Sequence, residues 1–160
     1  RESGSFTKKL GALSEGDELF LDGPYGVFTR EGQNDDPKVL IAGGVGITPF
    51  VRLVEEFGHE QTYLLNCNRS VGEAIYRKKL KEELGDRYFD VISNDKKAKG
   101  ENIIQGFLDR KVITDSIPHD VLMNGRIFFC GNPGFYRAIC EVLTEMGVSQ
   151  DQIFYEEFSV

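Results

Sequence analysis

The sequence has few cysteines, no excess of positive charge and no long apolar run. Its three cysteines, Cys67, Cys130 and Cys140, show no C-x-x-C spacing, so neither a disulfide framework nor a zinc or iron–sulfur site is indicated, and a reducing, cytoplasmic setting is favoured. The formal net charge of -7 excludes nucleic acid as an expected partner. No run approaches the roughly 18 apolar residues of a membrane span, and no signal-peptide pattern opens the chain.

The length and composition fit one globular domain with room for a fragment of a second. The chain has 160 residues, of which 40% are hydrophobic and 28% charged, enough to bury a core. It opens on Arg1, which is not a natural initiator, and its first segment resembles the middle of a longer protein. We therefore expect an excised piece; the alternative is a complete protein trimmed of a tag.

Two parts are predicted, with a boundary between residues 36 and 37. In the first part, 1–36, residues 6–13 suit one or two helical turns, and residues 17–21 read as a strand ended by glycine and proline. The polar stretch 31–37, which contains Gly and Pro, is typical of a linker or an exposed hairpin loop. The second part, 37–160, has a different pattern.

In the second part, short apolar runs alternate with amphipathic segments, which indicates strands alternating with helices. Strands are predicted over residues 38–42, 61–66, 88–92, 126–130 and 152–155. Helices are predicted over residues 49–57, 73–84 and 133–146. The fold class is therefore α/β, with a doubly wound five-stranded parallel sheet. Such sheets bind ligands at the carboxyl ends of their strands.

The strongest local motif spans residues 39–49, where a buried strand leads into Gly43, Gly44 and Gly46 and then into a helix start. Glycines let backbone amides approach a pyrophosphate, and a helix N-terminus favours its negative charge. The spacing is neither the G-x-G-x-x-G of dehydrogenases nor a Walker loop, because no lysine follows. The alternative is that the glycines serve only a tight turn.

Two further features are predicted to lie near the same edge of the sheet. Cys130 ends a strand just before a helix start, so its thiol could contact a ligand held by the glycine loop; the alternative is a buried small hydrophobe. Phe158 is an aromatic near the chain end, which is either packing or a plate that covers a planar cofactor.

These motifs, taken in order, resemble the signature of ferredoxin–NADP reductase-type flavoproteins. They are Gly-Pro-Tyr-Gly at 23–26, the glycine motif, Cys130-Gly131, and Glu156 with Phe158. The segment 3–7 looks most like the dehydrogenase domain of ferric-reductase and NADPH-oxidase-like proteins. The resemblance implies a Rossmann-like NAD(P)-binding domain preceded by the end of an antiparallel FAD-binding barrel of the same chain. Hydride would pass from NAD(P)H to FAD, and electrons would then pass to a haem, a ferredoxin-like iron–sulfur protein or a metal. The resemblance also allows a location at the cytoplasmic face of a membrane, as part of a larger protein.

The resemblance also assigns roles to residues. The coenzyme pyrophosphate and nicotinamide ribose would contact Gly43, Gly44, Val45, Gly46, Thr48 and Pro49. The nicotinamide side of the site would be formed by Cys130, Gly131, Asn132, Phe135, Glu156 and Phe158, with Cys130, Glu156 and Phe158 at the hydride-transfer site. Thr7 would contact the flavin. The sequence departs from the family where Asn132 replaces a usual proline and Phe135 a usual methionine, and the Arg-x-Tyr-Ser/Thr flavin motif is absent.

The adenosine end of the coenzyme is predicted from residues that follow the second and third strands. These are Asn68, Arg69, Ser70, Ser93 and Lys96. Arginine binds phosphate in a two-pronged way and lysine adds point charge, so the set favours NADPH over NADH. The alternative is that the lysines belong to a solvated loop.

Two other functions remain as alternatives. One is a non-catalytic NAD(P)H-binding regulatory module, which would have no need of a thiol facing nicotinamide or of an aromatic covering a flavin. The other is a transferase or hydrolase that binds the phosphate of another ligand at the glycine loop, although no evident nucleophile, base or metal set accompanies it.

Overall fold

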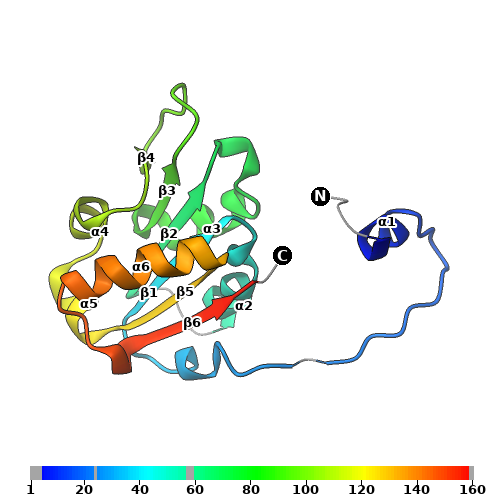
Figure 1. The fold of residues 1–160 in the computed structure, drawn as a ribbon, viewed down its shortest axis with the longest axis horizontal. Coiled ribbons are helices and arrows are strands. Elements are labelled where there is room, and N and C mark those ends of the chain that lie inside the picture. The colour runs from blue at the N-terminus through cyan, green and yellow to red at the C-terminus, as the bar shows by residue number, and fades with distance from the viewer. Residues whose placement is uncertain (1–4, 24, 57–59, 159–160) are drawn as a thin grey trace.

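One six-stranded parallel sheet organises the chain (Figure 1). The computed structural model describes residues 5–23, 25–56 and 60–158. The strands are β1 (Lys38–Gly43), β2 (Thr62–Asn68), β3 (Tyr88–Ile92), β4 (Ile103–Gln105), β5 (Arg126–Gly131) and β6 (Ile153–Glu157). Their order across the sheet is β4-β3-β2-β1-β5-β6, and every neighbouring pair is parallel. The predicted α/β class with a doubly wound sheet is confirmed.

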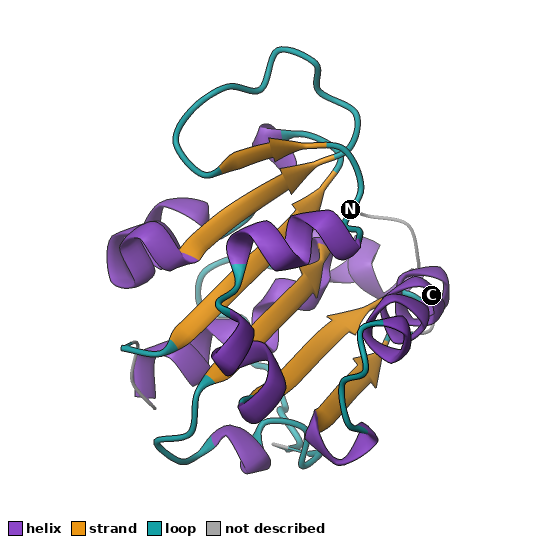
Figure 2. Cartoon of the chain, turned by 90° about the vertical axis from the view of Figure 1, so that its left-hand side faces the viewer, coloured by secondary structure: helices purple, strands orange, loops and turns teal. Residues whose placement is uncertain are grey.

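Helices cover both faces of the sheet (Figure 2). They are α2 (Thr48–Glu56), α3 (Arg77–Leu84), α4 (Arg110–Ser116), α5 (His119–Asn124) and α6 (Pro133–Glu145). One core cluster joins α2 and α3 to Leu40, Leu64 and Phe128, and the other joins α4, α5 and α6 to Ile41 and Phe129. Consecutive strand residues therefore enter opposite cores, and this explains why the central strands read as continuous apolar runs.

The sheet has one strand more than the five predicted. The additional strand, β4, has only three residues and pairs with β3 at the sheet edge, where Ile103 lies opposite Asp90. Three partly exposed residues are too few to produce a visible apolar run, so pairing with β3 defines this strand. The helices α4 and α5 were also not predicted, because each is short and Pro118 separates them.

The strand predicted over residues 17–21 is wrong for this structure. No strand forms there, and Phe20 and Leu21 are 97% and 94% exposed. A strand needs a partner to take up its backbone hydrogen bonds, and the described residues offer none at this place. The helical turns predicted before it are confirmed by α1 (Ser5–Gly11). Figure 1 shows α1 away from the sheet, at the end of an extended segment.

The polar segment before β1 is docked onto the sheet. Arg126, the first residue of β5, forms ion pairs with Glu31 at 2.9 Å and with Asp36 at 2.8 Å. The Phe28 ring packs edge-on against the Phe128 ring, with centroids 5.8 Å apart. The segment predicted as a linker thus contacts the sheet closely, while the domain boundary between residues 36 and 37 stays a prediction.

Candidate functional site

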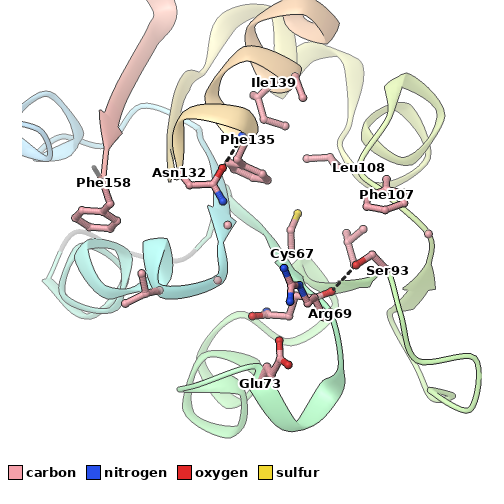
Figure 3. Close-up of a pocket in the computed structure, with 17 residues that line it drawn as sticks. Cys67, Arg69, Glu73, Ser93, Phe107, Leu108, Asn132, Phe135, Ile139 and Phe158 are labelled. Atoms are coloured by element: carbon pink, nitrogen blue, oxygen red, sulfur yellow. Dashed lines mark hydrogen bonds between the residues drawn. The ribbon is translucent and has the colours of Figure 1, made fainter. Parts of the chain in front are cut away.

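A cleft of about 440 Å³ opens at the carboxyl ends of the strands (Figure 3). It lies where the strand order reverses: the chain runs outward from β1 to β4 and then returns to place β5 on the other side of β1. Open parallel sheets form their ligand crevice at this switch point. The cleft is lined by Gly43, Gly44, Val45, Cys67, Asn68, Arg69, Glu73, Val91, Ser93, Gly106, Phe107, Leu108, Asn132, Phe135, Ala138, Ile139 and Phe158.

The predicted glycine motif forms the loop between β1 and α2. It is a short 3₁₀ helix, Gly44–Ile47, that leads directly into α2. Gly43, Gly44 and Val45 line the cleft, and the Val45 side chain is 60% exposed. Three other predicted members, Gly46, Thr48 and Pro49, are not part of the lining. Gly46 instead packs against the backbone of β5, so one glycine of the motif serves packing within the fold.

The turn after β5 supplies a second wall of the cleft. Asn132 is the N-cap of α6, and its side-chain oxygen accepts a 3.0 Å hydrogen bond from the Phe135 amide, drawn as a dashed line in Figure 3. The Phe135 ring lies so close to Gly131 that a Cβ there would be 2.6 Å from it. The two departures from the family pattern thus act together: Asn132 caps the helix, and Phe135 fills the space above Gly131.

Cys130 lies near the end of β5 and does not line the cleft. Its side chain is fully buried in the core cluster that contains Ile47 and Phe50. Burial, and then the charge of Glu156, raises the pKa of the Cys130 thiol to about 12, so the thiol is neutral near pH 7. Glu156 lies beside Cys130 in the sheet register and is exposed. The nicotinamide-side roles of both residues stay predictions.

Phe158 closes the cleft at the end of β6. Its amide donates a 2.9 Å hydrogen bond to the Gly131 carbonyl, so the backbone is held where the side chain enters the lining. Figure 3 shows the ring across the cleft from Phe107 and Ser93, with Asn132 and Phe135 between. The structure thus brings Phe158 together with the predicted glycine loop.

The predicted adenosine-end residues lie at the ends of β2 and β3. Asn68, Arg69 and Ser93 line the cleft. The Ser93 amide donates to the Asn68 carbonyl at 3.0 Å, and the Asn94 amide donates to the Arg69 carbonyl at 2.9 Å, so the two strand ends are fastened together. Ser70 and Lys96 are not in the lining, and Thr7 lies in α1 with its side chain outside the described residues.

Sequence reasoning missed about half of the lining residues. Glu73 brings a carboxylate into the cleft near Arg69, as Figure 3 shows, and an acidic residue in the loop after the second strand was the available signal. Phe107, 78% exposed, and Leu108 follow the unpredicted strand β4. The remaining members that were missed are Cys67, Val91, Gly106, Ala138 and Ile139.

Two kinds of site are not found in the described part of the chain. No group of three or more His, Cys, Asp or Glu side chains there could hold a metal ion. Every helix among the described residues is too short or too polar to cross a bilayer.

Comparison with known proteins gives consistent matches. The family model described as "Oxidoreductase NAD-binding domain" matches residues 40–141. The sequence is 29% identical over 175 residues to NADH-cytochrome b5 reductase 2 of Aspergillus niger, a match that covers 95% of this chain and 54% of that protein. The chain therefore spans about half the length of this relative.

Solved structures show the same fold. The flavohemoglobin of Malassezia yamatoensis, solved with bound FAD and haem, is 27% identical with a TM-score of 0.69, covering 98% of this chain and 41% of that one. The ferredoxin NADP⁺ reductase of Neisseria gonorrhoeae, solved with FAD and NADP, has a TM-score of 0.72 at 19% identity, covering 98% of this chain and 71% of that one.

Proposed function

The chain belongs to the oxidoreductase NAD-binding domain family, and from this premise we propose that it is the nicotinamide-nucleotide-binding part of an FAD-dependent reductase. It binds NAD(P)H so that hydride passes to FAD, and the electrons continue to an acceptor. The observation that carries the proposal is the cleft at the switch point of the sheet, where the glycine loop, the strand ends and Phe158 meet.

The chemistry of the cleft fits an extended dinucleotide. One end carries the aromatic rings of Phe135 and Phe158, which suit a planar nicotinamide ring. The other end carries Arg69 and Ser93, which suit a ribose or phosphate. Pockets for cofactors combine mostly apolar walls with a few such polar groups. The glycine loop between the two ends is the place for the pyrophosphate, next to the 3₁₀ turn that enters α2.

The role of the protein in this reaction is to position the coenzyme. Gly43, Gly44 and Val45 contact the pyrophosphate and ribose, and Gly46, Thr48 and Pro49 form the turn that positions them. Gly131, Asn132 and Phe135 shape the nicotinamide end. The flavin, when bound, accepts the hydride, and alignment of the two rings supplies several kcal/mol of barrier reduction. The Phe158 ring occupies the position that the nicotinamide ring takes during hydride transfer. Cys130 contributes to the hydride-transfer site from the buried core cluster, with its thiol neutral.

The FAD-binding barrel is proposed to lie on the N-terminal side of the chain. The segment before Phe28 presents several large apolar side chains to solvent, which is unusual in a protein surface unless another surface covers them. They are Phe6, Leu10, Leu13, Leu19, Phe20, Leu21, Tyr25 and Val27. In this proposal residues 1–36 are the end of the barrel, and Thr7 contacts the flavin.

The acceptor is proposed to be a haem protein or haem domain. This choice follows the printed names of the relatives, a cytochrome b5 reductase and a flavohemoglobin with bound haem. Three parts of the proposal rest on the sequence motifs alone. They are the closer likeness to ferric reductases and NADPH oxidases, a ferredoxin-like or metal acceptor, and a place at the cytoplasmic face of a membrane. Three free thiols suit a reducing, cytoplasmic compartment.

Binding and turnover separate the proposed function from its rivals. Calorimetric titration of the chain with NADH and NADPH should give one site per chain, whereas absence of binding for both would contradict the proposal. In the protein joined to its barrel, NAD(P)H should reduce FAD in a rapid-mixing experiment. A regulatory module would bind the coenzyme without reducing FAD, and a phosphate-binding transferase would prefer another ligand.

A further inference from the structure

Residues 28–37 are fastened to the sheet by one arginine at the end opposite the cleft. We call these residues the connecting segment, because they lead from the N-terminal part of the chain into β1. Arg126, the first residue of β5, donates from Nε to Asp36 Oδ2 at 2.8 Å and from Nη1 to Glu31 Oε2 at 2.9 Å. A single guanidinium group therefore binds two carboxylates of the segment.

The main chain of the connecting segment is bonded at the same place. The Arg126 amide donates to the Pro37 carbonyl at 2.8 Å. Lys38, which is 2% exposed, donates from Nζ to the carbonyl oxygens of Asn34 and Asp36, the second at 2.9 Å. The second half of the segment is therefore bonded to the first residues of both β1 and β5.

The first half of the connecting segment packs into the core cluster of α2. Gly32 is buried, and a Cβ there would be 2.8 Å from the Leu53 side chain and 3.2 Å from the Phe128 ring. The Phe28 ring lies 5.9 Å from the Phe50 ring and 5.8 Å from the Phe128 ring, centroid to centroid. Because these contacts are close, the segment has little freedom to slide over the sheet.

This packing ends at Phe28. Each large apolar side chain that the structure describes before Phe28 is at least 41% exposed. Figure 1 shows the chain leaving the sheet before the connecting segment and running out to α1. The contacts of the segment therefore set the position from which the N-terminal part of the chain departs.

We propose that Arg126 is a positioning residue, which sets the place of the FAD-binding barrel relative to the coenzyme cleft by holding the connecting segment on the sheet. The inference rests on the proposed function, in which the residues before the segment belong to that barrel. Hydride transfer needs aligned rings, and a displacement of about 1 Å can cost about 100-fold in rate. Arg126 lies roughly 16 Å along β5 from Gly131, at about 3.3 Å per residue, so it acts through the segment and not on the coenzyme.

The geometry explains why an arginine suits this position. Its planar guanidinium has donors on two sides and reaches Glu31 and Asp36 together, whereas the point charge of a lysine suits one carboxylate. The two carboxylates are 55% and 51% exposed, so each ion pair alone is weak and the segment depends on both. The guanidinium carbon also lies 5.8 Å from the centroid of the Phe154 ring.

The first measurement uses the chain itself. Arg126→Gln removes both ion pairs, so the backbone amides of residues 28–37 should exchange with deuterium about 3- to 10-fold faster, as followed by mass spectrometry. The dissociation constants of NADH and NADPH, measured by calorimetric titration, should stay within about twofold of the wild type, because Arg126 does not line the cleft. Lys111→Gln is the control: it removes one positive charge and the exposed ion pair with Asp115 on α4, and it should leave this exchange unchanged.

The second measurement uses the protein joined to its barrel. On rapid mixing with a saturating concentration of whichever coenzyme binds more tightly, Arg126→Gln should reduce FAD about 3- to 10-fold more slowly, with little change in the concentration that gives half the maximal rate. Arg126→Lys should recover part of the rate, because lysine restores the bond to one carboxylate. Lys111→Gln should keep the wild-type rate.

Each outcome has a separate meaning. If the exchange of residues 28–37 is the same in Arg126→Gln and in the wild type, Arg126 does not hold the segment and the proposal is wrong. If exchange is faster but FAD reduction keeps its rate, the segment has no part in aligning the rings, and the proposal is wrong while the proposed function stands. If the wild type neither binds the coenzymes nor reduces FAD, the proposed function fails and the positioning role fails with it. Should Arg126→Gln not fold, the double variant Glu31→Gln with Asp36→Asn removes the same two ion pairs and takes its place, with the same expected results.

Discussion

Gly46 lies directly against the main-chain carbonyl of Cys130, so close that a Cβ on Gly46 would be 2.0 Å from that oxygen. The glycine loop after β1 is thereby packed onto the last strand residues of β5. This contact brings the two predicted motifs together at one edge of the sheet. It also means that Gly46 is required by the fold, whatever the loop binds.

The first prediction concerns this contact. Gly46→Ala should destabilise the chain by about 1–3 kcal/mol, because the added methyl group forces the loop away from β5. The urea midpoint of unfolding measures the change. Gly72→Ala is the control, since nothing lies within 4 Å of a Cβ there, and its midpoint should stay close to that of the wild type. Equal midpoints for both variants would show that the loop can move at little cost.

The second prediction is a decline in stability at high pH. The pKa of the Cys130 thiol is raised from its ordinary value of 9.0 to about 12, first by burial and then by Glu156. The unfolded chain therefore releases this proton before the folded chain does. The contribution of the thiol to stability is complete below pH 9 and is lost as the pH rises toward 12.

Urea unfolding at pH 8 and pH 10.5 tests this titration. We expect the free energy of unfolding to fall more in the wild type than in Cys130→Ala, by about 1–2 kcal/mol, because alanine does not ionise. The comparison between variants removes the contribution of the lysines and tyrosines that titrate in the same range. An identical decline in both would show that the thiol does not carry the effect.

The fold was predictable where the pattern is local. The central strands β1 and β5 each contain four consecutive apolar residues, 39–42 and 127–130, and α6 begins at an Asn-Pro pair that marks a helix start, so both were found from the sequence. The strand β4 was not, because its three residues become a strand only by pairing with β3. The segment 17–21 has a strand pattern but no partner in the described structure.

The candidate site was predictable on the same terms. The glycine loop, Asn132 and Phe158 belong to motifs that can be read along the chain, and the structure places them in one cleft. Phe107 could not be found, because it enters the cleft from the end of the unpredicted β4. The hydrogen bond from Asn66 to Tyr88 could not be foreseen either, since the two residues become neighbours only when β2 and β3 pair.

The third prediction concerns Arg69 and the coenzyme phosphate. Its guanidinium lines the cleft at the end of β2 and can bind a 2′-phosphate in a two-pronged way. Arg69→Ala should remove a bond worth roughly 1.5–3 kcal/mol, weakening NADPH by about 10- to 150-fold and NADH very little. High salt should reduce the preference of the wild type for NADPH over NADH, because salt screens the attraction between solvent-exposed charges that produces part of this preference. If the affinity for NADPH and the affinity for NADH fall equally, Arg69 does not recognise the 2′-phosphate.

The last prediction concerns Glu73, whose carboxylate lines the same cleft as Arg69. A carboxylate repels a 2′-phosphate, which carries more negative charge than the hydroxyl that replaces it in NADH. Glu73→Gln keeps the shape of the side chain and removes the charge, so NADPH should bind about two- to fivefold more tightly, the range expected for an exposed charge pair. NADH should bind equally or slightly more weakly. Titration with both coenzymes measures the change in the ratio of the two dissociation constants, and Glu56→Gln, at the end of α2 and outside the cleft lining, is the matched control for the loss of one negative charge. If Glu56→Gln shifts the ratio as much as Glu73→Gln, the effect belongs to the net charge of the chain, and Glu73 has no specific part in coenzyme selection.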